Sequence, residues 1–193
     1  RPETELLVEK AIVWLQESPV RRTVADIGTG SGAIAVALAV NVPDADILAT
    51  DISPKALQVA KQNSLRHGVS ERITFIECDL LPTDPSSFIL HHSSLDLLCA
   101  NLPYIPTETL SQLPVFGREP TVALDGGADG LDLFRRLLTI APDWLAPNAL
   151  ILLEIEATQG IQALTLVCDM FSRAEIHLHQ DLTGRDRLLE IRL

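Results

Sequence analysis

The residues best suited to chemistry are Asn101-Leu102-Pro103-Tyr104, which come just after a strand-like apolar run from Leu95 to Cys99. The Asn101 side chain offers a carbonyl that accepts hydrogen bonds and an amide that donates them. Pro103 pushes Leu102 towards an extended conformation, which restricts the direction of the Leu102 carbonyl. Two such acceptors could hold both protons of a flat NH₂ group while the Tyr104 ring stacks on its face. The tetrapeptide therefore suits a weak nitrogen nucleophile, either a carboxamide or an adenine amino group.

A second chemically capable stretch is Asp26-Ile27-Gly28-Thr29-Gly30-Ser31-Gly32-Ala33. We expect a buried strand from Thr23 to Ile27, then the glycine turn, then a helix from Ala33 to Ala39. Glycine permits positive φ and lets the backbone approach a ligand, and a helix start offers unpaired N–H groups. This order predicts a site for the polar part of a nucleotide-like ligand. The spacing Gly28-x-Gly30-x-x-Ala33 also fits the dinucleotide fingerprint.

Two details of this stretch favour another cofactor. An acid, Asp26, stands two residues before the first glycine, and Gly32 follows Gly30 at a spacing of two. This acid-x-Gly-x-Gly-x-Gly pattern resembles the first motif of S-adenosylmethionine-dependent methyltransferases. The resemblance implies cofactor contacts from Asp26, Gly28, Thr29, Gly30, Ser31 and Gly32, with S-adenosylhomocysteine as the product.

Two further acids follow predicted strands. Asp51 comes after a strand from Asp46 to Thr50 and is placed to accept both hydroxyls of a ribose. Its alternative role is that of a helix N-cap, for which Ser53-Pro54 competes. Asp79 follows a strand from Arg72 to Glu77 and could accept from an adenine amino group, while Leu80 packs on the ring.

The other segments alternate between helix and strand patterns. Further helices are expected from Thr4, as N-cap, to Ser18, over Pro54 to His67, over Leu131 to Ile140 with Asp129 as N-cap, and over Gln159 to Met170; further strands are expected over Ala149 to Ile155, Ala174 to His179 and Arg187 to Arg192. The last two strands have no helix between them, so they should pair antiparallel at the sheet edge. The predicted fold is α/β, a seven-stranded mostly parallel sheet with helices on both faces. Asp132, Arg135, Arg136, His177 and His179 are interpreted as solvated residues.

Composition limits the range of functions. The 193 residues suffice for one domain, and no apolar run has the length of a membrane span. A net charge of −11 argues against sequence-independent binding to nucleic acid but permits a basic protein partner. Single cysteines at Cys78, Cys99 and Cys168 indicate buried, reduced thiols in a cytoplasmic protein. His91-His92 has no nearby cysteine or paired acid, so we expect no metal site.

Together these motifs resemble the HemK/PrmC family of peptide chain release factor glutamine methyltransferases over essentially the whole chain. The matching stretches are Arg1 to Glu5, Asp26 to Gly32, Asp51 to Ser53, Asp79-Leu80, Arg118 to Leu131, Glu154-Ile155 with Gln159-Gly160, and Asp181 to Arg187. The stretch from Arg118 to Leu131 is the most specific of these. The family usually has Asn-Pro-Pro-Tyr where this chain has Leu102, and Asn-Leu-Pro-Tyr is also the form found in ribosomal RNA adenine dimethyltransferases.

The resemblance implies a Rossmann-like class I methyltransferase domain over residues 1–193, with a helical substrate-recognition domain upstream of Arg1. It implies methyl transfer from S-adenosylmethionine to the side-chain amide nitrogen of the glutamine in a release factor's Gly-Gly-Gln motif. Asn101, Pro103 and Tyr104 would be catalytic, Leu102 would join them in binding the substrate, and Ile52, Leu80 and Asn101 would join the cofactor site.

Three alternatives remain open from the residues. The chain could methylate adenine amino groups in RNA or DNA, bind the cofactor without activity, or bind NAD as a dehydrogenase. A dehydrogenase would not need Asn101 to Tyr104 and should carry a hydride-transfer partner, which the sequence does not show.

Overall fold

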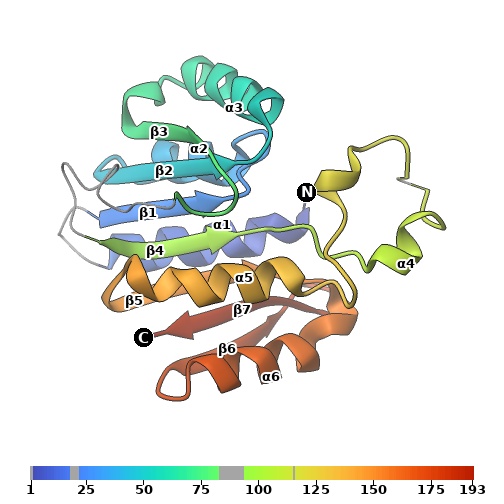
Figure 1. Cartoon of the computed structure of the whole chain (residues 1–193). Helices are drawn as coiled ribbons and strands as arrows, with labels where there is room; N and C mark the ends of the chain where they lie inside the picture. The colour runs from blue at the N-terminus through green and yellow to red at the C-terminus, as the bar shows by residue number, and fades with distance from the viewer. Residues whose placement is uncertain (1, 18–21, 83–93, 115) are drawn as a thin grey trace.

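A single mixed sheet organises the computed structural model, which describes residues 2–17, 22–82, 94–114 and 116–193 (Figure 1). Its strands are β1 (Arg22–Ile27), β2 (Ala45–Asp51), β3 (Ile73–Glu77), β4 (Leu95–Ala100), β5 (Leu145–Glu154), β6 (Glu175–Gln180) and β7 (Asp186–Arg192). Their order across the described sheet is β3-β2-β1-β4-β5-β7-β6. Strands β1 to β5 pair in parallel, whereas β7 runs antiparallel to both β5 and β6. The predicted fold class and its antiparallel terminal pair are confirmed.

Helices cover both faces of this sheet. The α-helices are α1 (Pro2–Gln16), α2 (Ala33–Asn41), α3 (Pro54–Arg66), α4 (Thr107–Leu110), α5 (Asp132–Ile140) and α6 (Gly160–Met170), and short 3₁₀ turns span Ser70–Arg72, Thr121–Ala123, Ala141–Asp143 and Ala157–Gln159. In Figure 1, α5 and α6 lie in front of the sheet and α1 lies behind it. Two buried clusters match this division, one containing Leu7 and Leu38 and the other containing Phe134 and Val167.

The central strands are apolar on both faces because helices cover both. Along β1, Val24 belongs to the α1–α2 cluster, whereas Ala25 and Ile27 belong to the α5–α6 cluster. The two-residue period of a strand places alternate side chains on opposite faces. A parallel strand between two helical layers therefore has a nearly continuous apolar sequence, and β1 is buried from Thr23 to Ile27.

Two expected helix caps are wrong. Helix α1 begins at Pro2, so Thr4 lies within it, and the Thr4 Oγ1 accepts a hydrogen bond from Asn101 Nδ2. Helix α5 begins at Asp132 with Leu131 as its N-cap. Asp129 lies further out, where its Oδ1 accepts from Leu131 N and from Arg135. Thr4 is thus bound by a residue 97 positions away, whereas Asp129 closes a local turn with Leu131 and pairs with Arg135.

Several surface assignments also need correction. Cys168 is exposed, because α6 buries Gly160, Ala163 and Val167 on its other side. His179 is half-buried and contacts the buried Glu190 on the neighbouring β7, so it is not a solvated residue. His177 remains exposed and bonds to Glu175.

The remaining differences are small. Strand β5 begins at Leu145 rather than Ala149, with a register irregularity opposite Leu95 to Leu97 and a positive φ of 63° at Asn148. His91 and His92 lie outside the described residues. Within the described chain, no helix combines the length and apolar character needed to span a membrane.

The packing of α5 provides a direct test of this fold. Leu137 is fully buried on the inner side of α5, whereas Leu65 on α3 is 67% exposed. We expect Leu137→Ala to lower the free energy of unfolding by about 2–5 kcal/mol, because it removes buried methyl groups and leaves a cavity. The matched variant Leu65→Ala should change it by no more than about 0.5 kcal/mol. Urea titrations followed by circular dichroism measure both, and equal losses would contradict the layer arrangement.

Candidate active site

The glycine turn after β1 is held in a conformation that few other residues adopt. Gly28, Gly30 and Gly32 have φ values of 68°, 57° and 82°. A Cβ on Gly28 would lie 3.0 Å from Leu102 Cδ2, and one on Gly32 would lie 3.0 Å from Ala60 Cβ. A Cβ on Gly30 would meet nothing within 4 Å. Gly28 and Gly32 therefore permit close packing, whereas Gly30 faces open space where a ligand could approach.

The side chain of Asp26 holds this turn through hydrogen bonds. Its side chain is completely buried, and its Oδ2 accepts hydrogen bonds from Thr29 Oγ1 at 2.5 Å and from Ala35 N at 3.0 Å. Burial raises the pKa of Asp26 to about 6, although the bonds from Thr29 and Ala35 lower it and the charge of Asp51 raises it slightly. The other oxygen, Oδ1, has no hydrogen-bond partner among the described residues. A buried polar atom without a partner is uncommon in a folded protein, and this one lies just before the glycine turn.

Asp51 links the glycine turn to the end of β2. Its Oδ2 accepts from Gly30 N and its Oδ1 from Ser53 N, both at 2.8 Å. Ser53 is the N-cap of α3, because its side chain accepts from Ala56 N and Pro54 follows it. Asp51 is therefore not the cap, and each of its oxygens keeps a further lone pair for a ligand hydroxyl.

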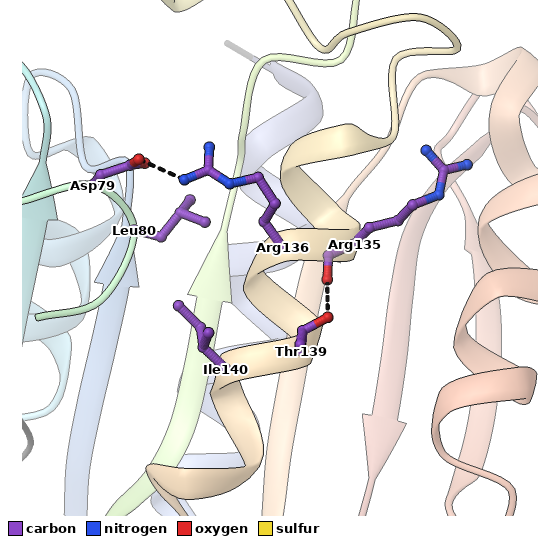
Figure 2. Close-up of a pocket in the computed structure, with 6 residues that line it drawn as sticks. All are labelled: Asp79, Leu80, Arg135, Arg136, Thr139 and Ile140. Carbon is purple, nitrogen blue, oxygen red and sulfur yellow. Dashed lines mark hydrogen bonds and ion pairs between the residues drawn. The ribbon is translucent and has the colours of Figure 1, made fainter. Parts of the chain in front are cut away.

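The Asp79-Leu80 turn after β3 is held from two sides. Leu80 has a φ of 64°, and its carbonyl accepts from the buried Thr50 hydroxyl at 2.6 Å. The Asp79 carboxylate accepts from Arg136, which reaches it from α5 (Figure 2). A non-glycine residue at positive φ is uncommon and needs such support.

Arg136 and Arg135 point in different directions from α5 (Figure 2). Arg136 faces a pocket of about 330 Å³ whose lining also includes Asp79, Leu80 and Ile140. Arg135 turns away from Asp79 and pairs with Asp129 and Asp132. Hydrogen bonding from Arg135 lowers the pKa of Asp129 to about 2. The side chains of Asp132, Arg135 and Arg136 are 48%, 42% and 52% exposed, so the predicted solvated face is confirmed, and its arginines also form ion pairs with acids there.

The Asn101–Tyr104 segment lies beside the glycine turn. Parallel pairing places Ile27 opposite Ala100, so the residues that follow β1 and β4 leave the sheet together. Leu102 is buried and packs towards Gly28. The Asn101 amide donates to Thr4 Oγ1 at 3.2 Å, which leaves its Oδ1 available as an acceptor. The Tyr104 ring is half-buried against the α5–α6 cluster.

The stretch from Arg118 to Leu131 packs onto the backbone of this segment. Ile105 N donates to Leu124 O at 3.0 Å, and Gly126 N donates to Ile105 O at 2.8 Å. A Cβ on Gly126 would lie 2.8 Å from Pro103 O. The resemblance singles out this stretch but does not indicate its contact with the substrate segment. Gly126 and Gly130 are the sequence features that could have indicated this close backbone contact.

The predicted cofactor residues meet at one edge of the sheet. Asp26 and Asp51 lie at the carboxyl ends of β1 and β2, and the other residues lie in the turns after β1 to β4, whose carboxyl ends share that edge. Ligands of open α/β sheets bind there. Their individual roles in binding stay predictions. Among the described residues, no group of three or more His, Cys, Asp or Glu side chains could hold a metal ion.

The buried Asp26 carboxyl should leave a signature in the pH dependence of stability. Its folded pKa of about 6 exceeds the ordinary aspartate pKa of 3.8, so the folded state binds the proton more tightly than the unfolded state. The contribution of Asp26 to stability must therefore fall as pH rises from about 4 to 6, by up to about 3 kcal/mol. We expect Asp26→Asn to gain about 1–2 kcal/mol relative to wild type between pH 5 and pH 7.

Urea midpoints of the ligand-free protein at several pH values measure this difference. Asp44→Asn is the matched control, because Asp44 is exposed, and its stability difference should stay constant over the same range. A constant difference for Asp26→Asn would show that the burial of this carboxyl is not costly.

Comparison with known proteins finds similar methyltransferases. A profile described as "Methyltransferase domain" matches residues 24–113. The release factor glutamine methyltransferase of Moorella thermoacetica is 43% identical over 188 residues, which are 97% of this chain and 64% of that protein. The protein of the same name from Geobacter sulfurreducens is 40% identical over 98% of this chain and 63% of its own length.

Solved structures agree with the fold. The release factor-specific protein-(glutamine-N5) methyltransferase of Alicyclobacillus acidocaldarius aligns with a TM-score of 0.62 and 26% identity, over all of this chain and 92% of that one. The ribosomal protein L11 methylase of Lactobacillus delbrueckii, at 20% identity and a TM-score of 0.65 over 97% of this chain and 77% of its own, shares the fold. The chain spans just under two thirds of the curated relatives described above. Over that length it is similar to methyltransferases whose curated members are named release factor glutamine methyltransferase.

Proposed function

We propose that residues 1–193 act as an S-adenosylmethionine-dependent methyltransferase domain that modifies the glutamine of the Gly-Gly-Gln motif in a peptide chain release factor. The observation that carries this proposal is the position of Asn101–Tyr104 directly beside the Gly28–Gly32 turn. One element suits a cofactor and the other suits a flat NH₂ group, and the sheet brings them together. The names of the relatives support the same reaction.

The residues at the sheet edge fit this cofactor. Gly30 faces open space, Asp26 keeps one buried oxygen without a described partner, and Asp51 keeps lone pairs on both oxygens. We propose that Asp51 accepts from the ribose hydroxyls and Asp79 from the adenine amino group, with Ile52 and Leu80 beside the ring. When bound, S-adenosylmethionine supplies a methyl group on a positively charged sulfur. The acids at this edge would favour that charge.

The substrate amide would be held by the chain's own acceptors. Asn101 Oδ1 is free to accept one amide proton because its Nδ2 is bonded to Thr4. The Leu102 carbonyl would accept the other, and the Tyr104 ring would lie against the flat amide. An amide nitrogen is weakly basic, so correct orientation rather than a strong base would provide most of the acceleration.

The position of Leu102 bears on the choice between glutamine and adenine. Its side chain is 2% exposed and faces Gly28, so it contacts the cofactor turn rather than a substrate. Leucine at this position therefore does not argue for a nucleic-acid substrate. The net charge of −11 favours a basic protein loop over a line of phosphates. We accordingly propose a release factor as the partner and the cytoplasm as the place of action.

Asp51 provides the test of the cofactor site. We expect Asp51→Ala to weaken the binding of S-adenosylhomocysteine by about 5- to 100-fold, because ligand hydroxyls and Gly30 N would lose their acceptor. Isothermal titration calorimetry measures the affinity. Asp143→Ala is the control, because Asp143 is exposed and precedes β5 at the opposite end of the strands. Binding of NAD in place of S-adenosylhomocysteine would reject the cofactor assignment.

Asn101 provides the test of the substrate. We expect Asn101→Ala to lower methylation of a release factor at least about 100-fold, since a mispositioned nucleophile loses most of its orientation advantage. The control Asn41→Ala, at the exposed end of α2, should keep wild-type activity. Mass spectrometry of the Gly-Gly-Gln peptide gives the product. A wild-type protein that labels ribosomal RNA and leaves the release factor unmodified would overturn the glutamine assignment.

A further inference from the structure

A buried glutamine joins three parts of the site that are distant in sequence. Gln159 lies at the start of α6 and is 5% exposed. Its Nε2 donates to Tyr104 O at 2.9 Å and to Asp129 O at 3.2 Å. Its Oε1 accepts from Glu156 N at 3.3 Å. Both polar atoms of the side chain are therefore occupied, and the amide can be oriented in only one way.

The surroundings of Gln159 preserve this contact. Gly130, with a φ of 81°, leaves the space in which the amide meets the Tyr104 carbonyl, because a Cβ there would overlap both groups. Glu156 completes a capping box with Gln159, which fixes the turn that carries it. On the other side, a Cβ on Gly160 would overlap the Asp186 carboxylate, so the backbone there packs closely against β7. The glutamine is thus held in place before any ligand binds.

Gln159 bonds to a segment with little regular structure of its own. Residues 101–104 belong to no helix or strand. At its start the segment is tied to α1 through Asn101 and Thr4, and at its end to α6 through Tyr104 O and Gln159. These two side-chain bonds bracket the acceptors and the ring that would hold the substrate amide.

We infer that Gln159 is a positioning residue that sets the place of Tyr104, and through it the alignment of the substrate amide. The inference rests on the proposed function for its effect on rate. Its geometric part does not, because the Gln159–Tyr104 contact can be tested without a substrate. An error of about 1 Å in the position of a reacting group can cost about 100-fold in rate.

Two substitutions of Gln159 distinguish a role in positioning Tyr104 from a role in packing. Gln159→Glu keeps the shape but replaces the donor with an oxygen that faces the carbonyls of Tyr104 and Asp129. Gln159→Met keeps the approximate volume and removes both hydrogen-bonding functions without adding a charge. Gln162→Glu is the matched control, because Gln162 lies three residues further along and is exposed on α6. We expect the two Gln159 variants to lower kcat by about 30-fold or more.

The same variants should leave the affinity for S-adenosylhomocysteine within about twofold, because Gln159 contacts none of the cofactor residues in the described hydrogen bonds. Tyr104 is the only tyrosine in this sequence, so labelling with 3-fluorotyrosine gives one ¹⁹F resonance. That resonance should shift or broaden in both Gln159 variants and stay unchanged in Gln162→Glu. This readout reports the ring directly and needs no turnover.

The outcomes test the proposed function and the positioning role of Gln159 separately. A wild-type protein without release factor methylation would reject the proposed function, whatever the fluorine spectra show. A wild-type protein with activity, combined with Gln159 variants of normal kcat and unchanged resonance, would reject the positioning role. A parallel loss of kcat and S-adenosylhomocysteine affinity would also reject it, since Gln159 would then support the fold as a whole.

Discussion

The parallel pairing of β1 with β4 is the constraint on which the site depends. Ile27 lies opposite Ala100, so Gly28 and Leu102 emerge from the sheet as neighbours. The register with β2, where Ile27 lies opposite Thr50, brings Asp51 to the same edge. Backbone hydrogen bonds of a buried sheet are costly to break, so this register resists slippage. The pairing of β1 with its neighbours therefore fixes the positions of both the cofactor turn and the substrate segment.

The three acids at this edge, Asp26, Asp51 and Asp79, are each stabilised by different partners, and each set of partners suits a different role in the site. Asp26 is buried and held by a hydroxyl and a helix N–H, at the expense of a raised pKa. Asp51 is held by two backbone N–H groups, which fix its direction without neutralising it. Asp79 is half-exposed and paired with Arg136. A site that binds a cationic sulfur and several donor groups gains from acids whose orientation is set before the ligand arrives.

Glycine serves two purposes in this molecule. At Gly30 the missing side chain leaves space, whereas at Gly126 and Gly130 it permits close backbone contact with residues 103 and 104. The second use explains why the most family-specific stretch lies outside the cofactor motifs. That stretch forms backbone hydrogen bonds next to the substrate segment. Gln159 adds a side-chain hydrogen bond to the segment from the start of α6.

The sequence by itself determined the features that arise from neighbouring residues. These were the strand, glycine turn and helix around Gly28, the Ser53 cap, and the antiparallel pairing of the last two strands, because each depends on local geometry or on a short connection. Tertiary structure decided the partners of Thr4, Arg136 and His179, and the role of Gln159. Polar side chains of these kinds are ordinarily solvated or capping residues. Only the folded arrangement brought them within hydrogen-bond distance of groups as many as 97 positions away.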